Sequence, residues 1–213
     1  KKHHILLIDD DIPYCEVLKK DASEKAIIIS YFHNLEDGIY ALKESKKYKA
    51  VILDGRCILN KEQEPGSGKK SFVFHAMQKI RDLVFERDRY LPLCINAESP
   101  EEFIEELDGI AQVFKKNKQH PEMISYLLKM IHDLPEVKIR QAHEKVFLFL
   151  EEYCNETDED LVEDLILNME KRDESSIISN LSTIRRLEEK VYDVLCIKYL
   201  KKDLHYFDGS RGS

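Results

Sequence analysis

The sequence predicts an α/β protein with a doubly wound parallel sheet in its first two-thirds, followed by a region made of helices alone. Through about residue 132, short aliphatic runs alternate with longer amphipathic stretches. Each run is about four residues long and rich in β-branched or aliphatic side chains, which is typical of strands buried on both faces of a parallel sheet. After Leu134 and Pro135 such runs stop. Alternating strands and helices predict a sheet with helices on both faces.

The first region is expected to hold five strands and five helices. The strands are expected at residues 5–8, 26–29, 51–53, 93–95 and 111–114. The helices are expected at roughly residues 13–22, 35–46, 71–87, 100–107 and 121–132. Prolines followed by acidic residues mark two of the helix starts, at Pro100 and Pro121.

The second region is expected to form three helices, at about residues 136–154, 158–171 and 174–202. The last of them has an apolar stripe that runs from Ile177 to Leu195. Three helices bury limited area alone, so this stripe is either core or the seam of a homodimer. We therefore expect three segments: residues 1–133 as one domain, residues 134–207 as a helical output or interaction domain, and residues 208–213 as a disordered or cloning-derived tail.

Charge and cysteine usage exclude several classes of protein. The net charge is −8, and the helical region from residue 134 carries 12 basic and 18 acidic residues. This acidity argues against bulk attraction to nucleic acid or to anionic membranes. No apolar run reaches the roughly 20 residues that span a bilayer. The five cysteines are scattered, odd in number and without C-x-x-C spacing, which favours reduced thiols in the cytoplasm over disulfides or zinc.

Polar residues stand where several of the predicted strands end. Asp9-Asp10-Asp11 follows the first strand, Asp54 the third, Asn96 the fourth and Lys115-Lys116 the fifth. A doubly wound fold brings these strand ends to one edge of the sheet. Clustered carboxylates repel each other unless a cation is present, and Mg²⁺ is the hard ion that keeps positions open for a phosphate oxygen. A lysine and an amide donor would hold the other phosphoryl oxygens.

The order of these segments resembles the receiver domain of two-component response regulators. The matching segments are residues 5–11 (ILLIDDD), 36–42 (EDGIYAL), 51–54 (VILD), 92–97 (PLCINA) and 111–116 (AQVFKK). The resemblance covers about residues 3–132 and implies a flavodoxin-like, five-stranded parallel sheet. It implies no enzyme activity beyond assistance to the domain's own phosphoryl transfer and dephosphorylation.

The resemblance also implies roles for the acidic residues. Asp54 would be the phospho-acceptor. Asp10 and Asp54 would ligate Mg²⁺ directly, together with the backbone carbonyl of Arg56, while Asp9 would act mainly through a bound water. The phosphoryl group would come from a sensor histidine kinase or a phosphotransfer protein of a phosphorelay.

Three departures from the family concern the switching mechanism. Asn96 stands at the position of the family's Thr or Ser, and its amide can still donate to a phosphoryl oxygen. Lys116 stands at the position of the phosphate-pairing lysine, but Asn117 replaces the proline that usually follows, so Lys115 is a second candidate. The polar loop at residues 60–70 is longer than the family's short turn, and it either covers the site or binds a partner.

Other residues with possible chemistry have simpler interpretations. Asp11, just before Ile12-Pro13, is placed to cap a helix. The segment Gly66–Ser71 lacks the first glycine of a phosphate-binding loop, so a flexible loop before a helix explains it better. His143 followed by Glu144 resembles a phosphotransfer histidine only faintly, and an exposed helical face explains it as well.

These observations predict a cytoplasmic phosphoprotein in which Mg²⁺-dependent phosphorylation of Asp54 switches a helical protein-interaction or dimerisation module. A first alternative is a pseudo-receiver scaffold that binds its partner without phosphorylation. A second is a DNA-binding transcriptional regulator, supported only by Arg185-Arg186 and Lys201-Lys202 in an otherwise acidic region.

Overall fold

The computed structural model describes residues 2–25, 27–86, 89–169 and 174–196. The chain divides into two compact units between Leu134 and Pro135. Within the described ranges, no helix combines the length and the apolar character needed to cross a membrane.

The first unit contains a five-stranded parallel sheet with the strand order β2-β1-β3-β4-β5. The strands are β1 (His3–Ile8), β2 (Ile27–Phe32), β3 (Tyr48–Asp54), β4 (Leu93–Ala97) and β5 (Gln112–Lys115). This is the order of the flavodoxin-like doubly wound fold, so the predicted fold class is confirmed. Ala26, predicted to open the second strand, lies outside the described residues. The order switches at β1, which lies between β2 and β3, and the carboxyl ends of these strands form the edge where ligands bind in such sheets.

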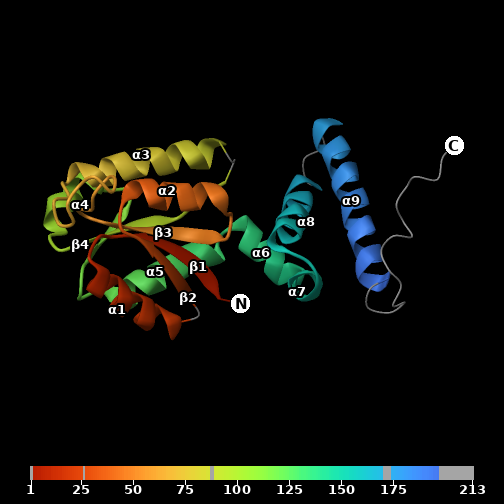
Figure 1. Cartoon of the computed structure of the whole chain (residues 1–213), viewed down its shortest axis with the longest axis horizontal. Coiled ribbons are helices and arrows are strands. Elements are labelled where there is room, and N and C mark those ends of the chain that lie inside the picture. The colour runs from red at the N-terminus through yellow and green to blue at the C-terminus, as the bar shows by residue number, and fades with distance from the viewer. Residues whose placement is uncertain (1, 26, 87–88, 170–173, 197–213) are drawn as a thin grey trace. The chain divides into compact units, whose positions relative to one another are not determined.

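Five helices cover the two faces of the sheet (Figure 1). They are α1 (Ile12–Ser23), α2 (Leu35–Glu44), α3 (Ser71–Glu86), α4 (Glu101–Leu107) and α5 (His120–His132). Helices α1 and α5 lie on one face, and α2 and α3 lie on the other (Figure 1). Asp11 caps α1 as predicted, because its carboxylate Oδ1 accepts a hydrogen bond from the Tyr14 N–H at 3.1 Å.

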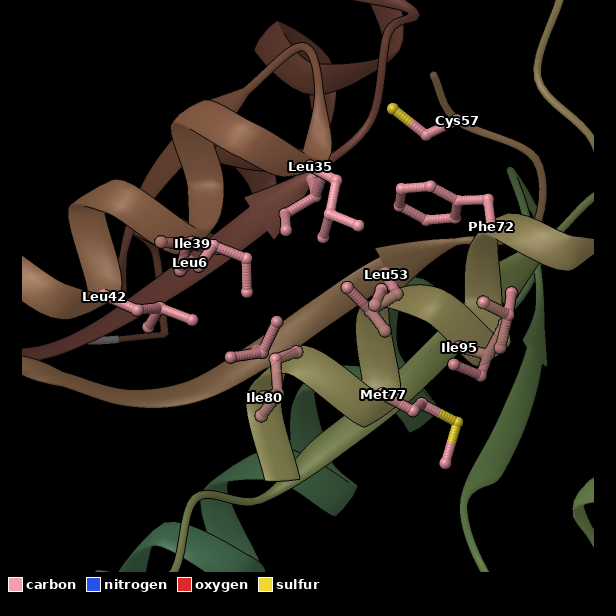
Figure 2. Packing of buried hydrophobic residues seen from close by; sticks show 14 of the residues in the cluster. Leu6, Leu35, Ile39, Leu42, Leu53, Cys57, Phe72, Met77, Ile80 and Ile95 are labelled. Carbon is pink, nitrogen blue, oxygen red and sulfur yellow. The ribbon is translucent and has the colours of Figure 1, made fainter. Parts of the chain in front are cut away.

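The alternation of side chains along the strands produces the core (Figure 2). Leu6 of β1, Leu53 of β3 and Ile95 of β4 point to the face that carries α2 and α3, and Ile8 belongs to the same cluster. There they meet the apolar sides of these helices, including Phe72. Both faces of the central strands are buried, which explains why the strands are continuous aliphatic runs.

The second unit contains four helices in its described part. They are α6 (Pro135–Ala142), α7 (Glu144–Tyr153), α8 (Glu156–Met169) and α9 (Glu174–Leu195). The prediction of a single helix at residues 136–154 was wrong. The helix is interrupted at His143, whose backbone has φ −117° and ψ 34°. No glycine or proline follows Pro135 in this segment, so packing causes the break. The turn allows both α6 and α7 to pack against α8. A single straight helix over the same residues would be about 28 Å long and would cross α8 only once.

The apolar stripe of α9 is divided between two environments. Leu187 packs against the small core formed by Phe147, Leu150 and Val162, and Val194 is also buried. The other apolar side chains of the stripe are between 42% and 61% exposed: Ile177, Leu181, Ile184, Val191 and Leu195. Residues 197–202 of the predicted last helix, including Lys201-Lys202, and the tail at 208–213 lie outside the described residues.

A buried ion-pair cluster joins α6 to α8. The Arg140 guanidinium donates to Glu163 at 2.6 Å and to Glu159 at 2.5 Å, and it lies 4.6 Å from the centre of the Phe147 ring. All three charged side chains are at most 15% exposed. A buried charge of this kind is stable only while its partner is present.

Replacing Arg140 with alanine is therefore expected to lower the free energy of unfolding of the helical unit by about 3 kcal/mol. Denaturant unfolding followed by circular dichroism measures this loss. Arg185→Ala is the matched control, because Arg185 and Glu189 form an exposed pair, and its removal should cost less than about 0.5 kcal/mol. Equal losses in the two variants would contradict the assignment of Arg140.

Candidate functional site

The carboxyl ends of β1 and β3 position three carboxylates at one edge of the sheet. Asp9 follows β1 and is fully buried, and Asp10 comes next. Asp54 is the last residue of β3 and is 7% exposed. Asp9, Asp10 and Asp54 each offer an oxygen atom, and these atoms lie within 4.8 Å of one another. The structure thus brings together the three acidic residues that were predicted as metal ligands.

Lys116, which directly follows β5, lies among these carboxylates. Its Nζ is 2.8 Å from Oδ2 of Asp9, 3.5 Å from Oδ1 of Asp54 and 4.0 Å from Oδ2 of Asp11. Lys115 points elsewhere, because its Nζ donates to the backbone carbonyl of Glu98. Of the two candidate lysines, Lys116 is therefore the one at the site.

The turn after Lys116 contains Asn117 with a φ of 62°, in the left-handed region. Asparagine tolerates this conformation better than most residues. Asn117 therefore reverses the chain here, while Lys116 stays tied to β4 by a hydrogen bond from its N–H to the Ala97 carbonyl at 2.8 Å.

The electrostatics of the site reflect an excess of negative charge. Burial raises the pKa of Asp9 to about 7, and repulsion from Asp54 adds to this rise. Burial also raises the pKa of Asp54, although Lys116 opposes the shift. Burial alone would lower the pKa of Lys116, but the carboxylates of Asp54 and Asp9 outweigh it, and the net shift is upward.

This arrangement fits a hard divalent cation. When ionised, the carboxylates of Asp9, Asp10 and Asp54 together with the Lys116 ammonium leave two negative charges uncompensated. Oxygen ligands and a charge deficit of this size suit Mg²⁺. The fourth predicted ligand is the backbone carbonyl of Arg56, whose side chain pairs with Glu102 at 2.5 Å.

The long loop after β3 lies against this site. The Gly66 N–H donates to Oδ2 of Asp10 at 2.5 Å. Two ion pairs hold the rest of the loop: Lys61 with Asp37 of α2 at 3.1 Å, and Lys70 with Glu106 of α4 at 2.5 Å. Of the two alternatives left open by the sequence, covering the site or binding a partner, the contact with Asp10 supports the first.

Gly68 is required for this loop path. A Cβ built on Gly68 would lie 1.8 Å from the carbonyl oxygen of Arg56, which is backbone and cannot turn aside. The same carbonyl is the predicted fourth metal ligand. The segment Gly66–Ser71 thus serves as a close-fitting cover over the strand ends, which favours the loop interpretation over the nucleotide-binding one.

Asn96, which the sequence predicted at the site, contacts a second group of side chains that the sequence did not predict. Asn96, the last but one residue of β4, donates from its amide Nδ2 to the hydroxyl of Tyr14 in α1. The Tyr14 hydroxyl lies 3.0 Å from Nε2 of His120, and Nδ1 of His120 lies 3.2 Å from Oδ2 of Asp21. The Lys116 Nζ lies 4.4 Å from the centre of the Tyr14 ring.

No local signal in the sequence identifies this second group. Tyr14 is 106 residues from His120, and only the packing of α1 against α5 brings them together. His143, the faint phosphotransfer candidate, lies in the second unit as the exposed residue before α7.

Gly68→Ala is expected to lift the loop from the site, because the added methyl group would collide with the Arg56 carbonyl. Asp10 would then lose the Gly66 hydrogen bond, so Mg²⁺ affinity should rise by up to about tenfold. Hydrogen exchange of the residue 60–70 amides and a Mg²⁺ titration measure both effects. Ser67→Ala is the neighbouring control and should change neither. Unchanged exchange in the Gly68 variant would contradict the proposed fit.

Mg²⁺ binding is also expected to weaken as the pH falls below about 7. With its raised pKa, Asp9 retains a proton that the cation must displace. Each pH unit below 7 should lower the apparent affinity by up to about tenfold. Calorimetric titrations in two buffers of different ionisation enthalpy count the released proton. Asp11→Asn, which alters a half-exposed acid outside the cluster, should retain the pH dependence. Equal affinity at pH 6 and pH 8 would exclude Asp9 as a ligand.

No protein-family model and no curated protein sequence matches the chain. Most of the similar solved structures are response-regulator receiver domains. A sensor protein from a Polaromonas species is 14% identical, covers 62% of this chain and 98% of its own, and gives a TM-score of 0.49. A receiver protein from Sinorhizobium medicae is 13% identical, with 62% and 97% covered and a TM-score of 0.47.

A response regulator from Thermotoga maritima, in complex with Mg²⁺ and BeF, is 18% identical, covers 60% of this chain and 98% of its own, and gives a TM-score of 0.45. At these identities the likeness concerns the fold of the first unit alone.

Proposed function

We propose that this chain is a cytoplasmic two-component response regulator, phosphorylated on Asp54 by a histidine kinase or a phosphotransfer protein. The observation that carries the proposal is the position of Lys116, whose ammonium lies between the carboxylates of Asp9 and Asp54 at the carboxyl edge of the sheet. A phosphoryl group on Asp54 would bring further negative charge to this ammonium.

The residues of the chain divide the work of phosphoryl transfer. The Asp54 carboxylate attacks the phosphorus of the donor, so that one oxygen–phosphorus bond forms while the bond from phosphorus to the donor nitrogen breaks. Lys116 neutralises charge on the transferred group, and the Arg56 N–H holds Oδ2 of Asp54 at 3.3 Å. Asp10, Asp54 and the Arg56 carbonyl would hold Mg²⁺ directly and Asp9 mainly through a bound water, and the cation would supply the remaining positive charge. The reaction is limited to the domain's own phosphorylation and dephosphorylation.

The helical unit is proposed as the output, a module for protein–protein contact or homodimerisation. Its own core and the buried Arg140 cluster support an independently folded unit. The exposed apolar side chains of α9 favour an interaction role. Its acidic composition argues against the DNA-binding alternative. Salt-sensitive retention of the protein on DNA would support that alternative instead. The pseudo-receiver alternative predicts the absence of phosphorylation.

Phosphorylation of Asp54 is tested by incubating the protein with Mg²⁺ and acetyl phosphate and recording its intact mass. A gain of one phosphoryl group is expected in the wild type and none in Asp54→Asn, because the acceptor oxygen is removed. Label that persists on the variant would identify another acceptor, and an unlabelled wild type would support the pseudo-receiver.

The lysines provide a matched pair for the same experiment. Lys116→Ala is expected to reduce the yield of the phosphorylated form by at least about tenfold, because the phosphoryl oxygens lose a charged donor worth roughly 1.5 kcal/mol or more. Lys115→Ala should leave the yield unchanged, since its ammonium contacts the Glu98 carbonyl instead. The reverse result would move the functional lysine by one residue.

A further inference from the structure

A chain of hydrogen bonds leads from the candidate phosphorylation site to the surface between α1 and α5. Asn96 is 1% exposed and Tyr14 is 3% exposed, while the side chains of His120 and Asp21 are 13% and 48% exposed. The contacts run in this order, from Asn96 to Tyr14, to His120, to Asp21. The chain starts beside Asp54, because Asn96 pairs with Asp54 in the register of β3 and β4.

The direction of each hydrogen bond follows from the chemistry of the groups. Asp21 is a carboxylate and only accepts, so Nδ1 of His120 carries a hydrogen. In a neutral imidazole Nε2 then has no hydrogen and accepts from the Tyr14 hydroxyl. Burial raises the pKa of Tyr14, so this hydroxyl keeps its one hydrogen and can donate to only one partner.

The observed orientation of Asn96 agrees with this direction. The Tyr14 oxygen, which donates to His120, accepts from Nδ2 of Asn96. The amide oxygen of Asn96 is on the opposite side, buried and without a hydrogen-bond partner among the described residues. A buried carbonyl that accepts no hydrogen bond lowers the stability of the fold, so this orientation needs the contact with Tyr14 to hold it.

A phosphoryl group on Asp54, the register partner of Asn96, would come near the side of the amide that does not contact Tyr14. It would favour the opposite orientation of the amide, because phosphoryl oxygens accept hydrogen bonds and would repel the Asn96 carbonyl. If the amide turns over, its NH₂ group faces away from Tyr14 and its carbonyl faces the Tyr14 hydroxyl. That hydroxyl must then donate to Asn96, so Nε2 of His120 must become the donor. A neutral ring with its hydrogen on Nε2 would direct the lone pair of Nδ1 at the Asp21 carboxylate, and the imidazolium avoids this repulsion.

We propose that Tyr14, held by His120 and Asp21, is the positioning residue that sets the orientation of the Asn96 amide, and that phosphorylation of Asp54 is thereby linked to uptake of one proton at His120. The inference rests on the proposed function and adds its regulation. One proton from solvent binds Nε2 of His120, the Tyr14 hydroxyl redirects its hydrogen to Oδ1 of Asn96, and the amide N–H becomes available to a phosphoryl oxygen.

The polar groups that the structure records near the His120 ring, among the described residues, come from α1 and from the end of β5. From α1 these are the carboxylate of Asp21 and the hydroxyl of Tyr14, and from the end of β5 Lys116 lies behind the Tyr14 ring. By reciprocity, protonation of His120 strengthens phosphoryl binding.

The test uses the full chain with Mg²⁺ and beryllofluoride, a stable mimic of the phosphoryl group. The ring nitrogens of His120 are followed by NMR from pH 5 to pH 9, with His120→Gln for assignment. Beryllofluoride is expected to raise the pKa of His120 by about one unit, a tenfold change in proton affinity. In Tyr14→Phe, which keeps the ring against Lys116 but removes the hydroxyl, the pKa should not respond. His132→Gln, at the other end of α5, should behave as the wild type.

Affinity measurements separate this effect from the titration of Asp9. Protonation of Asp9 is expected to weaken beryllofluoride binding equally in the wild type and in Tyr14→Phe. Dividing the affinity of the wild type by that of Tyr14→Phe therefore cancels the contribution of Asp9. This ratio should rise about tenfold between pH 8 and pH 6. Asn96→Thr, whose hydroxyl donates without the relay, should abolish both the rise and the His120 response.

The outcomes distinguish the two proposals. If beryllofluoride binds in a Mg²⁺-dependent way and the pKa of His120 stays constant, the relay is wrong and the proposed function stands. If beryllofluoride fails to bind the wild type at any pH, both are overturned. A His120 response that persists in Tyr14→Phe would show a direct electrostatic effect and would exclude Tyr14 as the link.

Discussion

The first unit depends on burying several carboxylates beside one ammonium at the carboxyl edge of a parallel sheet. Asp9 and Lys116 come from strands that are not neighbours, and they are both buried, so their 2.8 Å ion pair joins β1 to the end of β5. Burial of an ion pair adds little to the stability of the fold unless the remaining charge is also compensated. Here Asp54 shares the same ammonium, so the compensation is incomplete, and this deficit explains the other features of the site.

Backbone amides supply part of the missing positive charge. Asp9 accepts from the Asp11 N–H at 2.9 Å, Asp54 from the Arg56 N–H at 3.3 Å, and Asp10 from the Gly66 N–H at 2.5 Å. The first two donors lie two residues after the carboxylates that accept from them, and they belong to the same strand ends. The third comes from a loop 56 residues further along the chain. The long loop therefore contacts the carboxylate of Asp10, one of the three that could hold a cation, so we expect loop position and cation binding to compete.

The sequence was sufficient for the sheet and for the three acids, because both depend on local patterns. Aliphatic runs identify buried strands, and a parallel fold then places Asp9, Asp10 and Asp54 at one edge. It favoured Lys116 but kept Lys115 as a second candidate, since adjacent side chains at a strand end differ only by the turn that follows. Contacts that depend on tertiary packing, such as Tyr14 with His120 or the break at His143, left no local signal.

An amide at position 96 changes how a phosphoryl group can be sensed. A hydroxyl rotates about one bond and offers its hydrogen in any direction, but an amide has a donor side and an acceptor side in a fixed plane. Whichever group contacts one side of Asn96 therefore decides what the other side presents. Here that contact is the Tyr14 hydroxyl, whose hydrogen is shared with His120. In the proposed relay, an amide in place of a hydroxyl thus makes the site depend on the hydrogen-bond direction of its surroundings, and through His120 on proton concentration.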